Sequence, residues 1–229
     1  MKKYCIFACG GHGTRMGGDI PKQFLRIGDK TILQLSIERV LSAAGDIHPV
    51  VVLPPECVDF WREECGRMAL GVQQSIVKGG ITRFHSVRNA LGRIPEDDAV
   101  VAVHDGVRPL CSEKLVAALL SAAEKFDAVV PVVPVVDTLK VLETLPDGSF
   151  RQIEGQSADR SVLFGAQTPQ VFRSGVLRSA YSQPYNTAFT DDASVVQSAG
   201  VQVHYIPGER YNIKITTPED LLFARRFSF

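Results

Sequence analysis

The chain is 229 residues long, 45% apolar and 22% charged, which is the composition of a soluble globular protein and excludes a disordered or membrane-embedded one. Because 25 basic residues balance 25 acidic ones, no net charge favours nucleic acid or an anionic membrane as a partner, and any phosphate must be bound by a local group of donors. Five cysteines without a Cys-x-x-Cys pair predict reduced thiols, and the N-terminal apolar run is too short for a signal peptide or a membrane span. We therefore expect a cytoplasmic protein.

Up to residue 136 the chain alternates short apolar runs with amphipathic segments. Strands are predicted at 4–7, 50–53, 75–77, 99–103 and 128–136, and helices at 32–44, 58–68, 83–91 and 113–126. Hydroxyl residues directly precede three of these helices (Thr31, Thr82 and Ser112) and are typical N-caps, and Gln34 completes a capping-box pattern with Thr31. The alternation predicts an α/β fold, a mainly parallel Rossmann-like sheet with helices on both faces. Ligands of such sheets bind at the carboxyl ends of the strands.

The alternation stops at residue 137. Residues 137–160 contain two strand-like runs, 139–145 and 149–153, on either side of the turn Pro146-Asp147-Gly148. A hairpin with so few apolar residues is at best marginally stable alone, so we expect a protruding β-hairpin arm that a partner surface covers. The fold is predicted to resume at 161–164 and to continue through 173–182, a helix at 191–199, strands at 201–206 and 211–215, and a last helix opened by Thr217-Pro218. Without a repeat or linker, the chain is predicted to be a single domain over residues 1–229.

A glycine-dense turn at residues 10–18 follows the first predicted strand. Glycine lets backbone N–H groups approach an anion closely, and two cations, Arg15 and Lys22, lie in and just after the turn. The turn is not a P-loop, because the chain has no Gly-Lys dipeptide, and it is not a dinucleotide fingerprint, because Met16 stands at the third glycine. Two interpretations remain open, a phosphate-binding loop and a mobile turn with two surface cations.

Two further groups follow predicted strands. Gly79-Gly80 precedes a predicted helix that carries Arg83 and Ser86, and a helix N-terminus binds anions or polar edges through its free N–H groups. Ligand contact and an ordinary turn are equally good interpretations of that segment. Asp105 ends the central predicted strand, where a carboxylate suits a divalent ion or a substrate hydroxyl beside phosphates. An ion pair between Asp105 and Arg108 within a turn is the alternative.

The ordered motifs Gly-x-Gly-x-Arg-Met, Pro-Lys-Gln, His-Asp-Gly-x-Arg-Pro, Thr-Pro-Gln and Asn-Ile-Lys resemble those of the 2-C-methyl-D-erythritol 4-phosphate cytidylyltransferases, a likeness that covers residues 3–228. The resemblance implies a nucleotidyltransferase of non-mevalonate isoprenoid biosynthesis that joins CTP and 2-C-methyl-D-erythritol 4-phosphate, releasing pyrophosphate. The substrate phosphate would attack the α-phosphorus in line, so catalysis is positioning and charge neutralisation, with Mg²⁺ or another divalent cation as cofactor. The resemblance also implies a homodimer held through the 137–160 arm.

The resemblance assigns roles one residue at a time. Arg15 and Lys22 are the expected catalytic cations, and Asp105 is the expected metal ligand. The residues expected to contact the nucleotide are Gly11, Gly13, Gly79, Gly80, Arg83 and Ser86. Those expected to contact the polyol phosphate are Asp105, Arg108, Thr138, Arg160, Thr168, Thr190 and Lys214. From the residues alone, Thr190 is equally well the N-cap of its helix, and composition favours a solvent-facing strand lysine at Lys214.

Three positions depart from the family pattern: Cys9-Gly10 replaces Ala-Ala, Gly106 replaces Ala, and Tyr211 replaces an acidic residue. The first two changes are expected to cost little, and the third removes one acidic metal or substrate contact. Two alternative functions stay open. One is a cytidylyltransferase for another polyol phosphate, such as ribitol 5-phosphate, and the other is a non-catalytic nucleotide-binding module.

Overall fold

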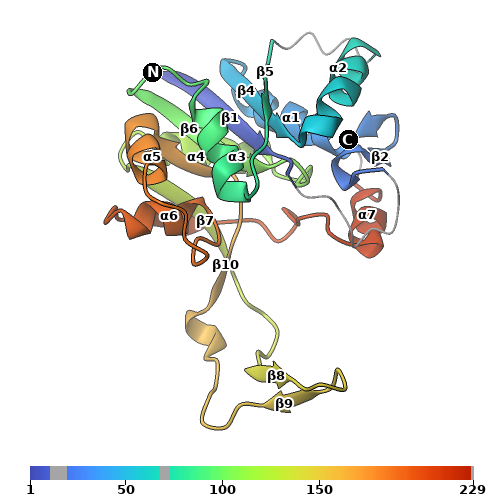
Figure 1. The fold of residues 1–229 in the computed structure, drawn as a ribbon, viewed down its shortest axis with the longest axis vertical. Coiled ribbons are helices and arrows are strands. Elements are labelled where there is room, and N and C mark those ends of the chain that lie inside the picture. The colour runs from blue at the N-terminus through green and yellow to red at the C-terminus, as the bar shows by residue number, and fades with distance from the viewer. Residues whose placement is uncertain (11–19, 68–72, 228–229) are drawn as a thin grey trace.

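The computed structural model describes residues 1–10, 20–67 and 73–227, which are built around an eight-stranded sheet (Figure 1). Seven strands lie in the order β10-β7-β11-β6-β1-β4-β5, and β12 pairs with β7. Their bounds are β1 Lys2–Ala8, β4 Ile47–Leu53, β5 Ser75–Lys78, β6 Ala99–Asp105, β7 Ala128–Pro134, β10 Phe164–Ala166, β11 Gln170–Arg173 and β12 His204–Pro207. Strands β10 and β11 run antiparallel to the other six, so the prediction of a mainly parallel sheet is confirmed.

Helices cover both faces of the sheet, as predicted. One face carries α1 (Ile32–Ala43), α2 (Val58–Arg67) and α4 (Glu113–Ala122), and the other carries α3 (Arg83–Leu91), α5 (Ser174–Tyr181) and α6 (Asp192–Ser198). Every residue of the central strand β6 is buried, because an apolar core lies on each side of it. The last helix, α7 (Pro218–Ala224), packs in a third, smaller cluster that includes Val107 and Ile215. None of the helices in the described ranges has both the length and the apolar content that crossing a bilayer requires.

The predicted helix starts are set by side-chain caps. The hydroxyls of Thr31, Thr82 and Ser112 each accept a hydrogen bond from the backbone N–H three residues later. The capping box predicted for α1 is only half formed: the Thr31 hydroxyl accepts from the Gln34 N–H, but the Gln34 Oε1 accepts no hydrogen bond, and its Nε2 donates to Glu38. A complete capping box opens α7, between Thr217 and Asp220.

Two predictions for the C-terminal third are wrong. Residues 211–215 form no strand, because Arg108 and Gln167 donate to the Asn212 carbonyl, at 2.7 and 3.3 Å, where a neighbouring strand would donate. Thr190 is not the N-cap of α6. That position belongs to Asp191, whose carboxylate accepts from the Ser194 N–H in a capping box.

The arm protrudes from the body as a hairpin, which confirms that part of the prediction (Figure 1). Its strands, β8 (Leu142–Thr144) and β9 (Phe150–Gln152), are shorter than expected and fully exposed. The turn between them closes at Gly148, whose φ of 83° favours glycine. The short elements that complete the fold are β2 (Arg26–Ile27), β3 (Lys30–Thr31), and the 3₁₀ turns η2 (Lys22–Phe24), η3 (Pro55–Cys57) and η4 (Arg160–Val162).

Gly106 packs directly against Cys9, so glycine at position 106 and cysteine at position 9 fit each other. A Cβ on Gly106 would overlap the Cys9 Sγ and lie 3.0 Å from the Leu33 Cδ1. Both neighbours are buried, so neither side chain has solvent to move into. The two departures from the family pattern, at positions 9 and 106, are therefore one packing arrangement.

Candidate active site

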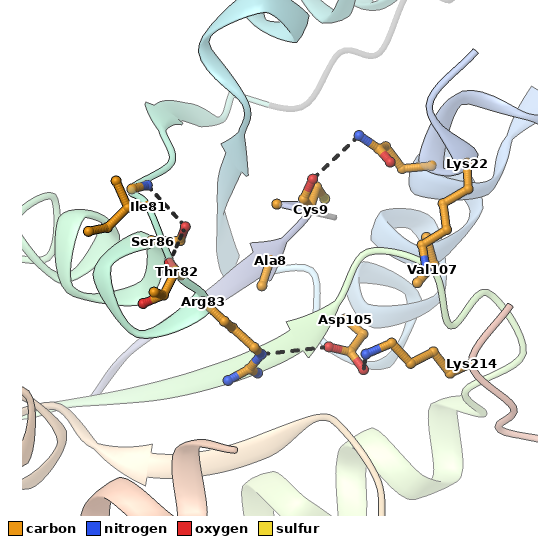
Figure 2. A pocket seen from close by; sticks show the side chains of 13 residues that line it. Ala8, Cys9, Lys22, Ile81, Thr82, Arg83, Ser86, Asp105, Val107 and Lys214 are labelled. Carbon is orange, nitrogen blue, oxygen red and sulfur yellow. Dashed lines mark hydrogen bonds and ion pairs between the residues drawn. The ribbon is translucent and has the colours of Figure 1, made fainter. Parts of the chain in front are cut away.

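A cavity of about 340 Å³ opens at the carboxyl ends of β1 and β6, where ligands of such sheets bind (Figure 2). Four segments form it: the end of β1, the η2 turn, the start of α3 and the end of β6. The loop before α7 adds one residue. The lining residues are Ala8, Cys9, Gly10, Lys22, Gln23, Gly80, Ile81, Thr82, Arg83, Ser86, Asp105, Val107 and Lys214.

Asp105 is the centre of charge in the cavity. Its carboxylate lies 3.1 Å from the Lys214 Nζ, 3.1 Å from the Arg108 Nε and 4.0 Å from the Arg83 Nε. Figure 2 shows Arg83 and Lys214 reaching it from opposite sides. Burial raises the pKa of the Asp105 carboxyl, but the charges of these three cations outweigh burial and hold the pKa well below its usual range. The cavity therefore contains a carboxylate that stays ionised, and Lys214 is not the solvent-facing strand lysine of the alternative interpretation.

Two buried side chains brace Asp105 from behind. The Thr168 hydroxyl accepts a hydrogen bond from the Asp105 N–H at 3.0 Å and lies 3.0 Å from the His104 Nδ1. Burial lowers the pKa of His104 to about 4, so its ring is neutral at physiological pH. Thr168 is 5% exposed and Arg108 also donates to the Asn212 carbonyl at 2.7 Å, so both support the cavity wall rather than line it.

The turn before α3 is shaped by close packing. Ser86 accepts a hydrogen bond from the Gly80 N–H at 3.0 Å and donates to the Thr82 carbonyl at 2.9 Å. A Cβ on Gly79 would lie 3.2 Å from the Ser86 hydroxyl, and one on Gly80 would overlap the His85 Cβ. Glycine is thus required at position 80, and a side chain at position 79 would be tight against Ser86 and the Leu53 carbonyl.

Lys22 stands on the opposite wall, on the η2 turn (Figure 2). The turn is fixed to the end of β1 by the buried Gln23, whose amide donates to the Cys9 carbonyl at 3.4 Å. Gly11, Gly13 and Arg15 lie outside the described residues. The described cations that line the cavity are Lys22, Arg83 and Lys214, an arrangement suited to a polyphosphate.

Besides Arg108 and Thr168, which support the wall, three of the predicted substrate residues lie away from this cavity. Thr138 and Arg160 lie in the exposed arm, where the Arg160 Nη1 donates to the Val136 carbonyl at 2.9 Å. Thr190 is exposed ahead of α6, and its N–H donates to the Ser194 hydroxyl at 3.0 Å. A single copy of the chain therefore brings Gly80, Arg83 and Ser86, of the residues predicted to contact the nucleotide, into one cavity and leaves the arm residues separate.

Among the described residues, the lining of the cavity offers one carboxylate to a metal ion, that of Asp105. The described residues contain no group of three or more His, Cys, Asp or Glu side chains placed to hold one. Mg²⁺ usually keeps several waters and takes one or two carboxylates together with substrate phosphates, so Asp105 fits a cation shared with a bound phosphate. Tyr211 supplies no ligand there and packs near Phe223 and Phe227 instead.

Sequence reasoning gave no site role to Gln23, Val107 or Asp192. Gln23 belongs to the Pro-Lys-Gln motif, and its place beside Lys22 was the available signal. Asp192 pairs with Arg83 across 109 residues, with Nη–Oδ distances of 2.9 and 2.6 Å. No local pattern indicates that pair.

Comparisons with known proteins find relatives over nearly the whole chain. A sequence model of the family described as 2-C-methyl-D-erythritol 4-phosphate cytidylyltransferase matches residues 4–227. The chain is 41% identical over 229 residues to the 2-C-methyl-D-erythritol 4-phosphate cytidylyltransferase of Phocaeicola vulgatus, covering 98% of each. It is 43% identical over 226 residues to that of Porphyromonas gingivalis, covering 98% of this chain and 97% of the relative. The crystal structure of the enzyme of that name from Thermus thermophilus is similar at a TM-score of 0.71 and 32% identity, covering 98% of both chains.

Proposed function

Because the chain belongs to the 2-C-methyl-D-erythritol 4-phosphate cytidylyltransferase family, we propose that its cavity binds CTP and presents the α-phosphate to 2-C-methyl-D-erythritol 4-phosphate. The chain is a nucleotidyltransferase, and the reaction yields 4-diphosphocytidyl-2-C-methyl-D-erythritol and pyrophosphate for isoprenoid biosynthesis. The observation that carries the proposal is the ionised Asp105, held among Arg83, Arg108 and Lys214 and faced by Lys22.

The chemistry follows from what these residues can hold. The phosphate of the acceptor is itself the nucleophile, so the protein needs no nucleophile or general base. We assign Lys22, together with Arg15 by the family resemblance, to neutralise the charge that grows on the α-phosphate, and Lys214 to the attacking phosphate, since Lys22 and Lys214 both line the cavity. The turn of Gly79, Gly80 and Ser86 offers backbone and hydroxyl contacts to the nucleoside.

We assign Mg²⁺, or another divalent cation, to Asp105 and the substrate phosphates. The single carboxylate at the cavity and the usual preference of Mg²⁺ for phosphate oxygens support this assignment. When bound, such an ion neutralises phosphate charge.

The arm is assigned to a second copy of the chain. It exposes apolar side chains, including Leu142 at 44% and Phe150 at 69%, on a hairpin that makes no sheet with the body. In a two-fold dimer, within which each copy is one domain over residues 1–229, the arm brings Thr138 and Arg160 to the partner's cavity, where a guanidinium suits the acceptor phosphate. Thr190 then contributes from its own body.

We place the reaction in the cytoplasm. Each of the five cysteines lies among the described residues and is a free thiol, which supports a reducing compartment.

The test is a turnover screen with CTP and Mg²⁺. We expect pyrophosphate release with 2-C-methyl-D-erythritol 4-phosphate, weaker release with ribitol 5-phosphate, and none without an acceptor. A preference for ribitol 5-phosphate would move the assignment to that alternative, and no release with either would leave the non-catalytic module. Light scattering at micromolar concentration tests the dimer, and a fully active monomer would contradict it.

A further inference from the structure

Arg83 lies between two carboxylates, one in the cavity and one buried behind it. Its two Nη atoms bond both oxygens of Asp192, while its Nε lies 4.0 Å from the Asp105 carboxylate. Asp192 is the first residue of α6 and has no exposed surface, and the Tyr181 hydroxyl donates to its Oδ1 at 2.5 Å. The two Nη donors of Arg83 therefore face away from the cavity.

This arrangement bears on the contact expected between Arg83 and the nucleotide. A bidentate guanidinium–carboxylate pair fixes both the position and the plane of the guanidinium. With both Nη atoms on Asp192, Arg83 acts on the cavity through its charge near Asp105. Without Asp192, the fork would turn to Asp105, the other carboxylate within 4.0 Å, and would compete with Lys214 for it.

We propose that Asp192 and Tyr181 are positioning residues that hold Arg83 back from Asp105, leaving that carboxylate open to Lys214 and to the substrates. The inference rests on the proposed function, since it concerns the same cavity. Because Asp192 directly follows Thr190 and Asp191, the ion pair also fixes the segment assigned to the acceptor against the helix that begins at the nucleotide turn.

The chain offers a matched control at the other end of β1. There the Tyr4 hydroxyl donates to Glu96 at 2.7 Å, and Glu96 forms an ion pair with Lys2. Tyr4, Glu96 and Lys2 thus make the same kinds of contact, outside the cavity, as Tyr181, Asp192 and Arg83. Tyr4→Phe and Glu96→Gln remove the same groups as Tyr181→Phe and Asp192→Asn.

We expect Asp192→Asn to lower kcat/KM for CTP about tenfold and Tyr181→Phe about threefold, while Tyr4→Phe and Glu96→Gln stay within twofold of the wild type. In an Arg83→Gln background, Asp192→Asn should cost less than twofold further, because Asp192 acts through Arg83. Thermal unfolding of all variants shows whether stability changes in step with activity.

Three results would overturn the positioning role: kinetics of Asp192→Asn and Tyr181→Phe within twofold of the wild type, equal losses in the control pair, or full additivity with Arg83→Gln. If Asp192→Asn does not fold, Tyr181→Phe decides alone, since it removes one hydroxyl and keeps the ring. Failure of the proposed function is distinguishable, because the wild type itself would then release no pyrophosphate. In that case, calorimetric CTP binding by the same variants tests the role, with weaker binding by Tyr181→Phe supporting it and unchanged binding overturning it.

Discussion

Asp105 contacts three cations and is braced through its own N–H by Thr168, whereas Arg160 in the arm donates to one carbonyl and is otherwise exposed. The cavity is thus built within one copy of the chain, from segments that lie far apart in sequence and are held by buried bonds. The arm contains Thr138 and Arg160 on an exposed hairpin that makes no sheet with the body. The contrast supports the proposal that the nucleotide side of the site lies within one copy of the chain and that its acceptor side needs another surface.

Lys22→Ala should have the largest effect, because it removes a preorganised cation from the cavity. Loss of such a donor costs about 3–4 kcal/mol of transition-state stabilisation, a fall of roughly 10²–10³ in kcat. Steady-state pyrophosphate release measures it, and Arg15→Ala is expected to behave alike. Lys30→Ala is the control, since Lys30 pairs with Glu38 away from the cavity lining. Near-normal kcat/KM in Lys22→Ala would exclude its transition-state role.

Arg160→Ala tests the arm. Losing a charge-assisted contact to phosphate costs about 1.5–3 kcal/mol, so the KM for the acceptor should rise roughly 10- to 100-fold while the KM for CTP changes little. Arg151, which pairs with Glu143 on the same arm, provides the control variant Arg151→Ala. Equal weakening of both substrates would mean that Arg160 supports only the fold.

The same variant separates action within one copy from action across a dimer. Mixing Lys22→Ala with Arg160→Ala protein creates dimers in which one cavity has an intact Lys22 and receives an intact Arg160 from its partner. Activity should therefore recover on mixing and subunit exchange. If exchange is demonstrated without recovery, Arg160 acts within its own chain.

Gly106→Ala should destabilise the cavity wall, because the added methyl group overlaps Cys9 in a packed core. Overpacking of this kind costs about 1–3 kcal/mol of unfolding free energy. Cys9→Ala should restore most of the loss in the double variant, which urea denaturation measures. A Gly106→Ala protein as stable as the wild type would show that the strand ends adjust freely.

The last prediction concerns the loss of folding stability at low pH. The folded pKa of His104 is about 4 against an ordinary value of 6.5, because the ring is buried, so the unfolded chain takes up the proton first. Its contribution to stability is present above pH 6.5 and is lost as the pH falls toward 4, about 2 kcal/mol of it between pH 7 and pH 5. Urea titrations at several pH values should show this slope, and His104→Asn should flatten it, whereas arm variants should not.

Local patterns predicted what is local in this fold. The N-caps Thr31, Thr82 and Ser112 accept hydrogen bonds from N–H groups three residues away, and Asp105 ends a continuous apolar strand. Each of these features could therefore be predicted from residues adjacent in the sequence. The antiparallel entry of β11 between β6 and β7 could not, because the bonds that set it join residues far apart in the chain.

The candidate site divides in the same way. Lys22, Gly80, Ser86 and Asp105 carry motif signals and line the cavity. An aspartate at the start of a helix, such as Asp192, indicates only a favourable interaction with the helix dipole, and its bond to Arg83 depends on tertiary folding. The predicted strand at 211–215 failed for a related reason, since distant side chains occupy the Asn212 carbonyl.

The contact between Cys9 and Gly106 also has a consequence for how such sequences can diverge. Alanine at position 106 meets a sulfur atom while cysteine is present at position 9, whereas alanine at position 9 removes that sulfur and leaves the Leu33 Cδ1, at 3.0 Å, as the remaining close neighbour. A lineage that replaces Cys9 and Gly106 with alanine at both positions by single substitutions avoids this overlap in one order only. Position 9 changes to alanine first, and position 106 changes second. In the reverse direction, position 106 must return to glycine before a thiol can be accommodated. Two changes that look independently neutral along the sequence are thus ordered in time by a single van der Waals contact.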